Sequence, residues 1–387
     1  MTTRPERTRR VAQVAALHAD AVDREGRFPA EAIAALRSEG LLGIQVPRQF
    51  GGEGADMSQV ADTCFALGQA CSATAMIFAM HQIKVASLVT HGVESAWHRA
   101  LMERVARDQL LVASATTEGG IGGDLRNSLC AVETRGDRFT LRKDATVISY
   151  GAHADVILAT ARRHPDAAGS DQVLVALLAD QVTLERTSRW DTLGMRGTCS
   201  DGFLLAAQDV PTAQVLPKPF AEIAAQSMLA ASHLLWSSLW FGIASSAVDR
   251  ARTFVQAEAR RRPGTVPPGA LRLAEAVSAL QTLKGTIHGG LRRFEDAKDS
   301  PDDLGSVGFA VMLNNVKTVA STAAVEIVQT ALGIVGISGY KNGTPFSLGR
   351  PLRDVLSAPL MISNDRIVAN TASLLLVQKG GGQFLSA

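Results

Sequence analysis

The hydrophobic periodicity of the chain changes twice, and these changes restrict the fold more than any other feature. Up to about residue 110, apolar residues recur every three or four positions, which is the spacing of amphipathic helices. From about 113 to 216 the chain has short apolar runs with β-branched residues, separated by Gly, Asp and Pro, as in the strands of a barrel or sandwich. Helical periodicity then returns. We therefore predict an α+β, mainly helical protein with an N-terminal helical domain (1–112), a middle β domain (113–216) and a C-terminal four-helix bundle (217–387).

The last part of the chain contains enough helical sequence for such a bundle. Pro263, Pro267 and Pro268 separate its first two segments, because proline interrupts a helix and favours a turn. Long helical segments joined by short connections are typical of helical bundles. The predicted helices cover about 221–260, 268–297, 303–335 and 350–378.

Charge and composition exclude several classes of protein. The 387 residues include 39 basic and 37 acidic ones, and no basic block is interleaved with aromatic residues, which argues against a nucleic-acid partner. The N-terminus has no apolar core of a secretion signal, so we expect a cytoplasmic protein. The longest apolar run, in Leu234–Val248, is shorter than the ~20 residues of a membrane span, so we expect a buried helix and no membrane partner.

The cysteines predict neither a metal site nor a disulfide framework. Cys64, Cys71, Cys130 and Cys199 lie far apart except for one gap of seven residues, and no histidine lies at ligand spacing from them. We expect reduced thiols that pack as small apolar side chains.

Four stretches of the chain resemble, in the same order, motifs of the acyl-CoA dehydrogenase superfamily. The segment 28–60 is similar to the family's first-domain motif, in which a helix ends before "GL.GI.VP" and a Gly-rich turn. ASATTEGGIGGDL (113–125) is similar to the "TEP.AGSD" loop, WDTLGMRGTCSDGF (190–203) to "LG.RGT.S", and GISGYKNGTPFSLGRPLRD (336–354) to "GG.GY…R..RD". The resemblance covers nearly the whole chain and implies the helix, β-domain, helix fold of these flavoproteins.

The resemblance places the loop 114–124 and the segment 147–151 against a flavin, which is expected to be FAD, with FMN as the alternative. Glycines in the loop let backbone N–H groups approach a polar ligand, and its threonines supply hydroxyl donors. Without the resemblance, an ordinary Gly-rich β-turn fits the loop equally well. The implied flavin contacts are Ser114, Thr116, Thr117, Gly122, Gly123, Ile148, Ser149, Arg260, Gly336 and Asn364.

The family's cofactor site is shared between subunits, which implies a homotetramer or homodimer. Arg260 or Arg261 would then contact a pyrophosphate through bidentate guanidinium donors. The alternative is that both arginines are solvated charges at the end of a helix. A tryptophan that the family has beside the flavin is replaced here by Val147, whereas a neighbouring hydroxyl is kept at Ser149.

The family's usual catalytic glutamate is absent. In these dehydrogenases it removes the proton α to the thioester carbonyl, and it lies eight residues after the position of Asp354, where this chain has Ile362. Some relatives carry the glutamate on the first bundle helix, where this chain has Ser232. Neither side chain is a carboxylate, so neither can be the base.

Three other titratable residues are candidate catalytic groups. His233 ranks first and His81 second, because histidine is well suited to proton transfer at neutral pH. Asp365 lies one helical turn from the position of the missing glutamate. Each also has a structural interpretation: the histidines as hydrogen-bonded core residues, and Asp365 as an ion-pair partner of Arg366 or Arg353.

Three functions follow from the resemblance. The favoured one is flavin-dependent oxidation of an acyl thioester, carried by CoA or an acyl carrier protein, with another base or a more acidic proton. A positioned general base contributes ~10²–10⁴-fold to a rate, so an ordinary desaturase would suffer without one. The alternatives are a monooxygenase that uses reduced flavin and O₂, and a non-catalytic subunit that pairs with an active homologue.

Overall fold

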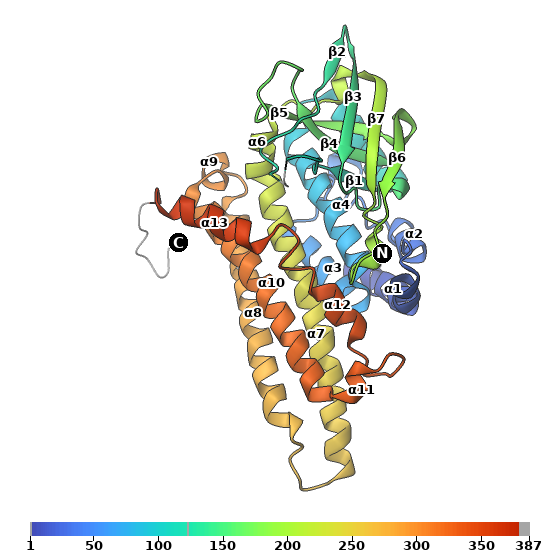
Figure 1. Cartoon of the computed structure of the whole chain (residues 1–387), viewed down its shortest axis with the longest axis vertical. Coiled ribbons are helices and arrows are strands. Elements are labelled where there is room, and N and C mark those ends of the chain that lie inside the picture. Colours follow the sequence, from blue (N-terminus) through green and yellow to red (C-terminus); the bar gives the residue numbers. More distant parts are fainter. Residues whose placement is uncertain (1, 122–123, 379–387) are drawn as a thin grey trace.

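The computed structural model describes residues 2–121 and 124–378. Its N-terminal part is helical (Figure 1). Thr3 and Glu6 form a capping box at the start of the first helix, and Asp56 and Gln59 form another at the third. Glycine in the left-handed conformation ends the first helix at Gly26. The helices are α1 (Arg4–Glu25), α2 (Ala30–Ser38), α3 (Met57–Ala70), α4 (Ser72–His91) and α5 (Ala96–Asp108).

The middle part contains two small sheets. In the first, β1 pairs in parallel with β4, and β4 pairs antiparallel with β5. In the second, the order is β2-β3-β7-β6 and all pairs are antiparallel. The strands are β1 (Val112–Ala115), β2 (Glu133–Arg135), β3 (Arg138–Ala145), β4 (Val156–Arg162), β5 (Gln172–Leu178), β6 (Val182–Ser188) and β7 (Gly202–Pro211). The strands therefore lie in the predicted region, while the domain boundaries themselves stay a prediction.

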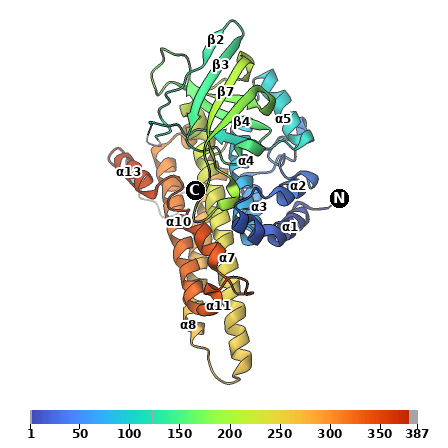
Figure 2. The same cartoon turned by 45° about the vertical axis from the view of Figure 1, so that its right-hand side comes forward.

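Three long helices dominate the C-terminal part and project away from the sheets (Figures 1 and 2). The long helices are α7 (Leu229–Arg261), α8 (Gly269–Ala297) and α10 (Val307–Val335). The shorter helices are α6 (Phe220–Ile223), α9 (Pro301–Leu304), α11 (Ile337–Tyr340), α12 (Gly349–Val355) and α13 (Asn364–Leu375), and a π-helical turn (Ala224–Met228) joins α6 to α7.

The predicted helix over 350–378 is interrupted. It consists of α12 and α13, and residues 356–363 between them form turns. The physical reasons are Pro359, which interrupts a helix at this point, and a set of hydrogen bonds from α10 to the connection, described below. The fourth member of the bundle is therefore two short helices that pack across α10.

Close packing of α7 against α3 joins the N-terminal and C-terminal parts. A Cβ atom on Gly68 of α3 would lie 2.4 Å from the carbonyl oxygen of Leu239, and one on Gly242 of α7 would lie 2.3 Å from that of Phe65. Both distances are too short for real atoms, so glycine is required on both helices. This contact fixes the position of α7 relative to the N-terminal helices.

Two helices, α4 and α10, are long and apolar enough to cross a membrane by length and composition alone. Of their apolar windows, 83% is buried inside the protein in α4 and 44% in α10. Helix α4 is thus a core helix that is buried on nearly all sides. The expectation that the chain has no membrane partner stays a prediction.

Candidate active site

The end of β1 and the loop after it carry three of the predicted flavin contacts. Ser114, Thr116 and Thr117 are half-buried there. The Thr117 hydroxyl donates to the carbonyl oxygen of Val147 at 3.0 Å, so the loop lies against the segment that follows β3. The sequence thus brings together the two segments that the resemblance places against a flavin.

A buried ion pair between Glu118 and Lys143 holds this loop in place. Glu118 accepts hydrogen bonds from Lys143 Nζ at 3.0 Å, from the Ser128 hydroxyl at 2.8 Å and from the Cys130 backbone N–H at 2.6 Å. Burial opposes ionisation of Glu118, but Lys143 and these hydrogen bonds hold the pKa of its carboxyl below the usual value. The loop is therefore anchored to β3 by charge-assisted bonds.

Three hydroxyls form a chain beside this loop, and we call them the hydroxyl cluster (Ser149, Thr198 and Ser200). The Ser200 oxygen lies 2.8 Å from the Ser149 oxygen and 2.8 Å from the Thr198 oxygen. Two neighbouring residues, Tyr150 and Cys199, have positive φ of 45°. Residues other than glycine rarely adopt this backbone conformation, and such strain gathers at functional sites.

Helix α12 holds the turn that carries this cluster. Asp354 Oδ1 accepts a hydrogen bond from the Met195 backbone N–H at 2.7 Å, and Met195 itself has φ of 52°. Burial raises the pKa of Asp354, which the Met195 hydrogen bond opposes. A Cβ on Gly194 would lie 2.1 Å from the carbonyl oxygen of Arg353, so the turn and the helix are in direct backbone contact. The "LGMRGTCS" and "RD" motifs thus meet in space.

The first-ranked base candidate, His233, is buried on α7. Its Nδ1 lies 3.1 Å from the hydroxyl of Ser232, the residue at the alternative glutamate position. Burial and the neighbouring charge of Lys317 lower the pKa of His233 to about 3. The ring is therefore neutral at physiological pH and is a weak proton acceptor.

One face of α7 carries three buried nitrogen atoms without hydrogen-bond partners in the described part of the chain. They are His233 Nε2, Trp236 Nε1 and Trp240 Nε1. Positions i, i+3 and i+7 lie on the same side of a helix. Because buried polar groups are almost always hydrogen-bonded, this face is suited to a ligand or water: the two indole N–H groups need acceptors, while His233 Nε2 can accept when the proton is on Nδ1. The sequence spacing of Trp236 and Trp240 fits both a flavin or acyl pocket and ordinary core, because it says nothing about their partners.

Lys317 of α10 holds the connection between α12 and α13, where the family's glutamate would be. Its Nζ donates to the carbonyl oxygens of Ile362 at 2.7 Å and Ala358 at 3.2 Å, and to Asn364 Oδ1 at 2.7 Å. Ile362 has φ of 49°, an outlier for a β-branched residue. Burial lowers the pKa of Lys317 to about 8. At the position of the family's glutamate, this chain therefore has an apolar Ile362 side chain, and the Ile362 backbone is bound by Lys317.

The other predicted residues near this region have structural contacts. The His81 ring donates from Nε2 to the carbonyl oxygen of Leu42 at 2.8 Å and accepts the Val112 N–H at Nδ1 at 3.0 Å, so both nitrogens are occupied. The Ile148 backbone N–H donates to the carbonyl oxygen of Asp201. Asp365 is exposed in the first turn of α13.

Two predicted flavin contacts lie away from this region. Arg260 is exposed at the end of α7, and Gly336 is exposed at the end of α10, at the opposite end of the molecule from the sheets (Figure 1). Within one chain they do not meet the hydroxyl cluster. Gly122 and Gly123 lie outside the described residues.

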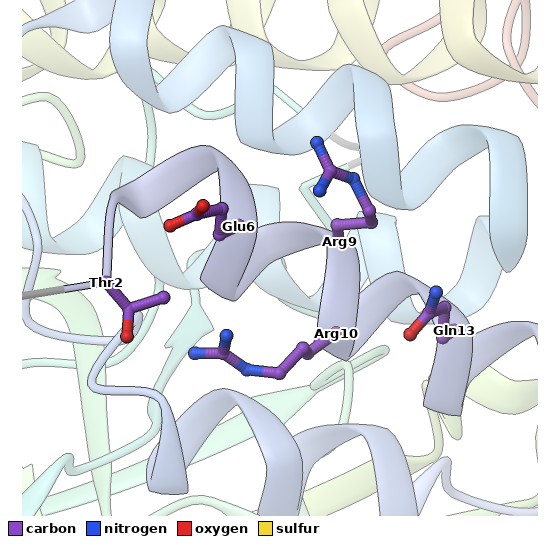
Figure 3. A pocket seen from close by; sticks show the side chains of 5 residues that line it. All are labelled: Thr2, Glu6, Arg9, Arg10 and Gln13. Carbon is purple, nitrogen blue, oxygen red and sulfur yellow. The ribbon is translucent and has the colours of Figure 1, made fainter.

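A hollow on the outer surface of α1 is not part of the candidate site. It is lined by Thr2, Glu6, Arg9, Arg10 and Gln13 (Figure 3). Glu6 already accepts the Thr3 N–H, and Arg10 is paired with Glu39. Among the described residues, no group of His, Cys, Asp and Glu side chains is arranged to hold a metal ion.

Comparison with known proteins identifies the family. The model of the family "Acyl-CoA dehydrogenase, N-terminal domain" matches residues 5–108. Over 324 residues the chain is 24% identical to cyclohex-1-ene-1-carbonyl-CoA dehydrogenase of Syntrophus aciditrophicus, covering 82% of this chain and 76% of the relative. Residues 5–108 thus match the acyl-CoA dehydrogenase family, and the longer relatives support the same superfamily for the chain.

Solved structures confirm the fold, and those that share it represent two kinds of enzyme. FMN-bound TdsC of Paenibacillus sp. A11-2, a dibenzothiophene monooxygenase, has a TM-score of 0.82 at 18% identity and covers 97% of each chain. Butyryl-CoA dehydrogenase of Megasphaera elsdenii has a TM-score of 0.81 at 19% identity and covers 97% of this chain and 100% of the other. The comparisons therefore establish the architecture. The reaction has to be inferred from the residues of the site.

Proposed function

We propose that the protein is a flavin-dependent monooxygenase that uses reduced flavin and O₂. One observation carries the proposal: no carboxylate occupies either position where the superfamily's dehydrogenases keep their base. Ile362 and Ser232 stand there, His81 has no free nitrogen, and Asp365 is exposed. Oxidation by reduced flavin and O₂ needs no base at a substrate α-carbon. The missing carboxylate is therefore compatible with this reaction.

The described residues fit a flavin. Half-buried hydroxyls of Ser114, Thr116, Thr117 and Ser149 gather at one edge of the β domain, where they can donate to a polar ring. The bound flavin would supply two electrons, while one oxygen atom enters the product and the other leaves as water. The residues would bind the flavin, and the buried face of α7 would limit access of water to it.

Dehydrogenation of an acyl thioester, carried by CoA or an acyl carrier protein, is the second candidate. It is favoured by one observation: His233 Nε2 has no hydrogen-bond partner in the described part of the chain and can accept a proton from a substrate. Its low pKa makes it a weak base, so this reaction would need a substrate with an acidic proton, such as an amino- or hydroxyacyl thioester.

Flavin binding in two redox states tests the proposal. We expect the purified protein to bind reduced FMN or FAD more tightly than the oxidised form, and to accelerate O₂ consumption when a separate reductase supplies reduced flavin. Ser149→Val should weaken flavin binding about 3- to 10-fold, the effect of one hydrogen bond. The exposed Ser170→Val is the matched control and should leave binding unchanged.

Other outcomes of this experiment reject the proposal. Tightly bound oxidised flavin that an acyl thioester bleaches without O₂ would establish the dehydrogenase instead. Absence of flavin binding in both redox states would reject both enzymes and leave the non-catalytic subunit.

A further inference from the structure

Three lysines are buried among the described residues, and one of them lacks an adequate partner. Lys143 Nζ donates to a Glu118 oxygen and to Thr160 oxygens, and Lys317 Nζ donates to three oxygens on the α12–α13 connection. Lys84 of α4 is 4% exposed, and its Nζ has a single contact, the Met228 sulfur at 3.1 Å. A thioether is a weak acceptor, so this ammonium group keeps unused N–H donors.

The environment of Lys84 makes its charge costly in the protein alone. Burial is the sole cause of its lowered pKa, about 8, so no charged group of the described residues compensates it. At neutral pH the side chain is still mostly protonated. Buried charges are normally paired, and an unpaired one is a candidate for a functional role.

Lys84 lies where the substrate cavity is expected. It is one helical turn from His81, which contacts the first residue of β1, and the loop after β1 carries the predicted flavin contacts. Its partner Met228 ends the π-helical turn and precedes Ser232, the alternative base position, by one turn of α7. Insertions of this type are frequent at functional sites. The thioethers of Met80 and Met228, both half-buried, can reorient to admit a ligand.

We propose that Lys84 binds a carboxylate group of the substrate, at the end that lies away from the oxidised atom. A carboxylate supplies the counter-charge and oxygen acceptors that the protein does not. A phosphate or diphosphate fits less well, because it needs several donors and Lys84 is the one cation at this position among the described contacts. The inference rests on the proposed function only in taking this face of α4 and α7 as part of the substrate cavity.

Ligand binding to the whole protein tests the inference without any flavin reaction. Octanoate and octanamide have the same length and differ in charge, and their affinities can be measured by calorimetry. We expect octanoate to bind at least about 10-fold more tightly, the effect of a charged hydrogen bond. Lys84→Met should bind both ligands alike, while the exposed Lys341→Met keeps the preference. Inorganic phosphate should not compete with octanoate.

The outcomes separate this inference from the proposed function. Equal affinity of the unaltered protein for the acid and the amide overturns the inference, as does a preference that survives in Lys84→Met, or competition by phosphate. Lys84→Met removes an unpaired buried charge, so we expect its melting temperature to be unchanged or raised. If that variant does not fold, Lys84→Gln gives the same comparison. A Lys84-dependent preference in a protein without flavin activity supports the inference and rejects the monooxygenase.

Discussion

At the scale of single residues, burial keeps the ring of His81 neutral, although its hydrogen bond to Leu42 opposes this effect. Burial lowers its pKa from 6.5 to about 4. The unfolded chain takes up a proton near pH 6.5 and the folded chain near pH 4. The stabilisation by neutral His81 is therefore fully present above pH 6.5 and is lost as the pH falls through about 4.

His81→Gln tests this linkage. Glutamine keeps one donor and one acceptor but does not titrate. We predict that between about pH 5 and 6 the free energy of unfolding of the unaltered protein falls about 1.4 kcal/mol per pH unit more steeply than that of the variant. Denaturant unfolding across this range measures the difference, with His164→Gln, at an exposed position, as control. Equal slopes in all three proteins would contradict the assignment of His81 as a neutral structural residue.

The sequence predicted where the residues of the candidate site lie along the chain, but not which contacts their side chains make. Ile362 is recognisable because it lies eight residues after Asp354, and Ser232 because it aligns with a position on the first bundle helix. The occupation of both His81 nitrogens was not predictable, because Leu42 and Val112 reach the ring only through the tertiary fold. The same holds for Lys84, whose isolation from oxygen acceptors is visible only in three dimensions.

At the scale of elements, Pro359 and contacts from α10 together account for the break in the last helical segment. Sequence periodicity predicted one helix over 350–378, because the apolar residues continue at helical spacing through 356–363. Lys317 stabilises turns here instead of a continuous helix. Its ammonium group donates hydrogen bonds to the carbonyl oxygens of Ala358 and Ile362 and to the side chain of Asn364. Lys317 is about forty residues away, so its part in the break was not visible locally, whereas Pro359 in the connection is a local signal that the periodicity argument passed over.

Lys317→Met should therefore loosen the α12–α13 connection. It leaves the carbonyl oxygens of Ala358 and Ile362 without this donor, while Asn364 Oδ1 keeps the Ser321 hydroxyl, and we predict a loss of about 1.5–3 kcal/mol in the free energy of unfolding. Faster hydrogen exchange confined to residues 356–364 would locate the effect. Lys341→Met, at an exposed position, is the control. Unchanged stability and exchange in Lys317→Met would mean that Lys317 does not hold this connection.

At the scale of the whole molecule, the order of helical, β and helical regions was predictable because hydrophobic periodicity is a local property. The sequence did not predict how residues at the far end of the chain's long helices would contribute to a flavin site. Arg260 and Gly336 lie at the far end of the molecule from the hydroxyl cluster, and apolar side chains such as Val319 and Ile337 are exposed on α10 and α11. Exposed apolar surface of this kind is typical of contacts between chains.

We predict a homodimer or homotetramer in which one chain brings Arg260 to the flavin of another. Light scattering should give a mass at least twice that of one chain, and Val319→Glu with Ile337→Glu should lower both the mass and the affinity for flavin. A monomer that binds flavin as tightly as the assembled protein would contradict this arrangement.

The central claim is that this site oxidises its substrate without removing an α-proton. Anaerobic mixing of the flavin-loaded protein with a panel of acyl thioesters, including amino- and hydroxyacyl ones, tests it most directly. We predict that the absorbance of oxidised flavin persists with every thioester. Rapid bleaching by any of them, abolished in His233→Ala, would contradict the claim and identify His233 as the base of a dehydrogenase.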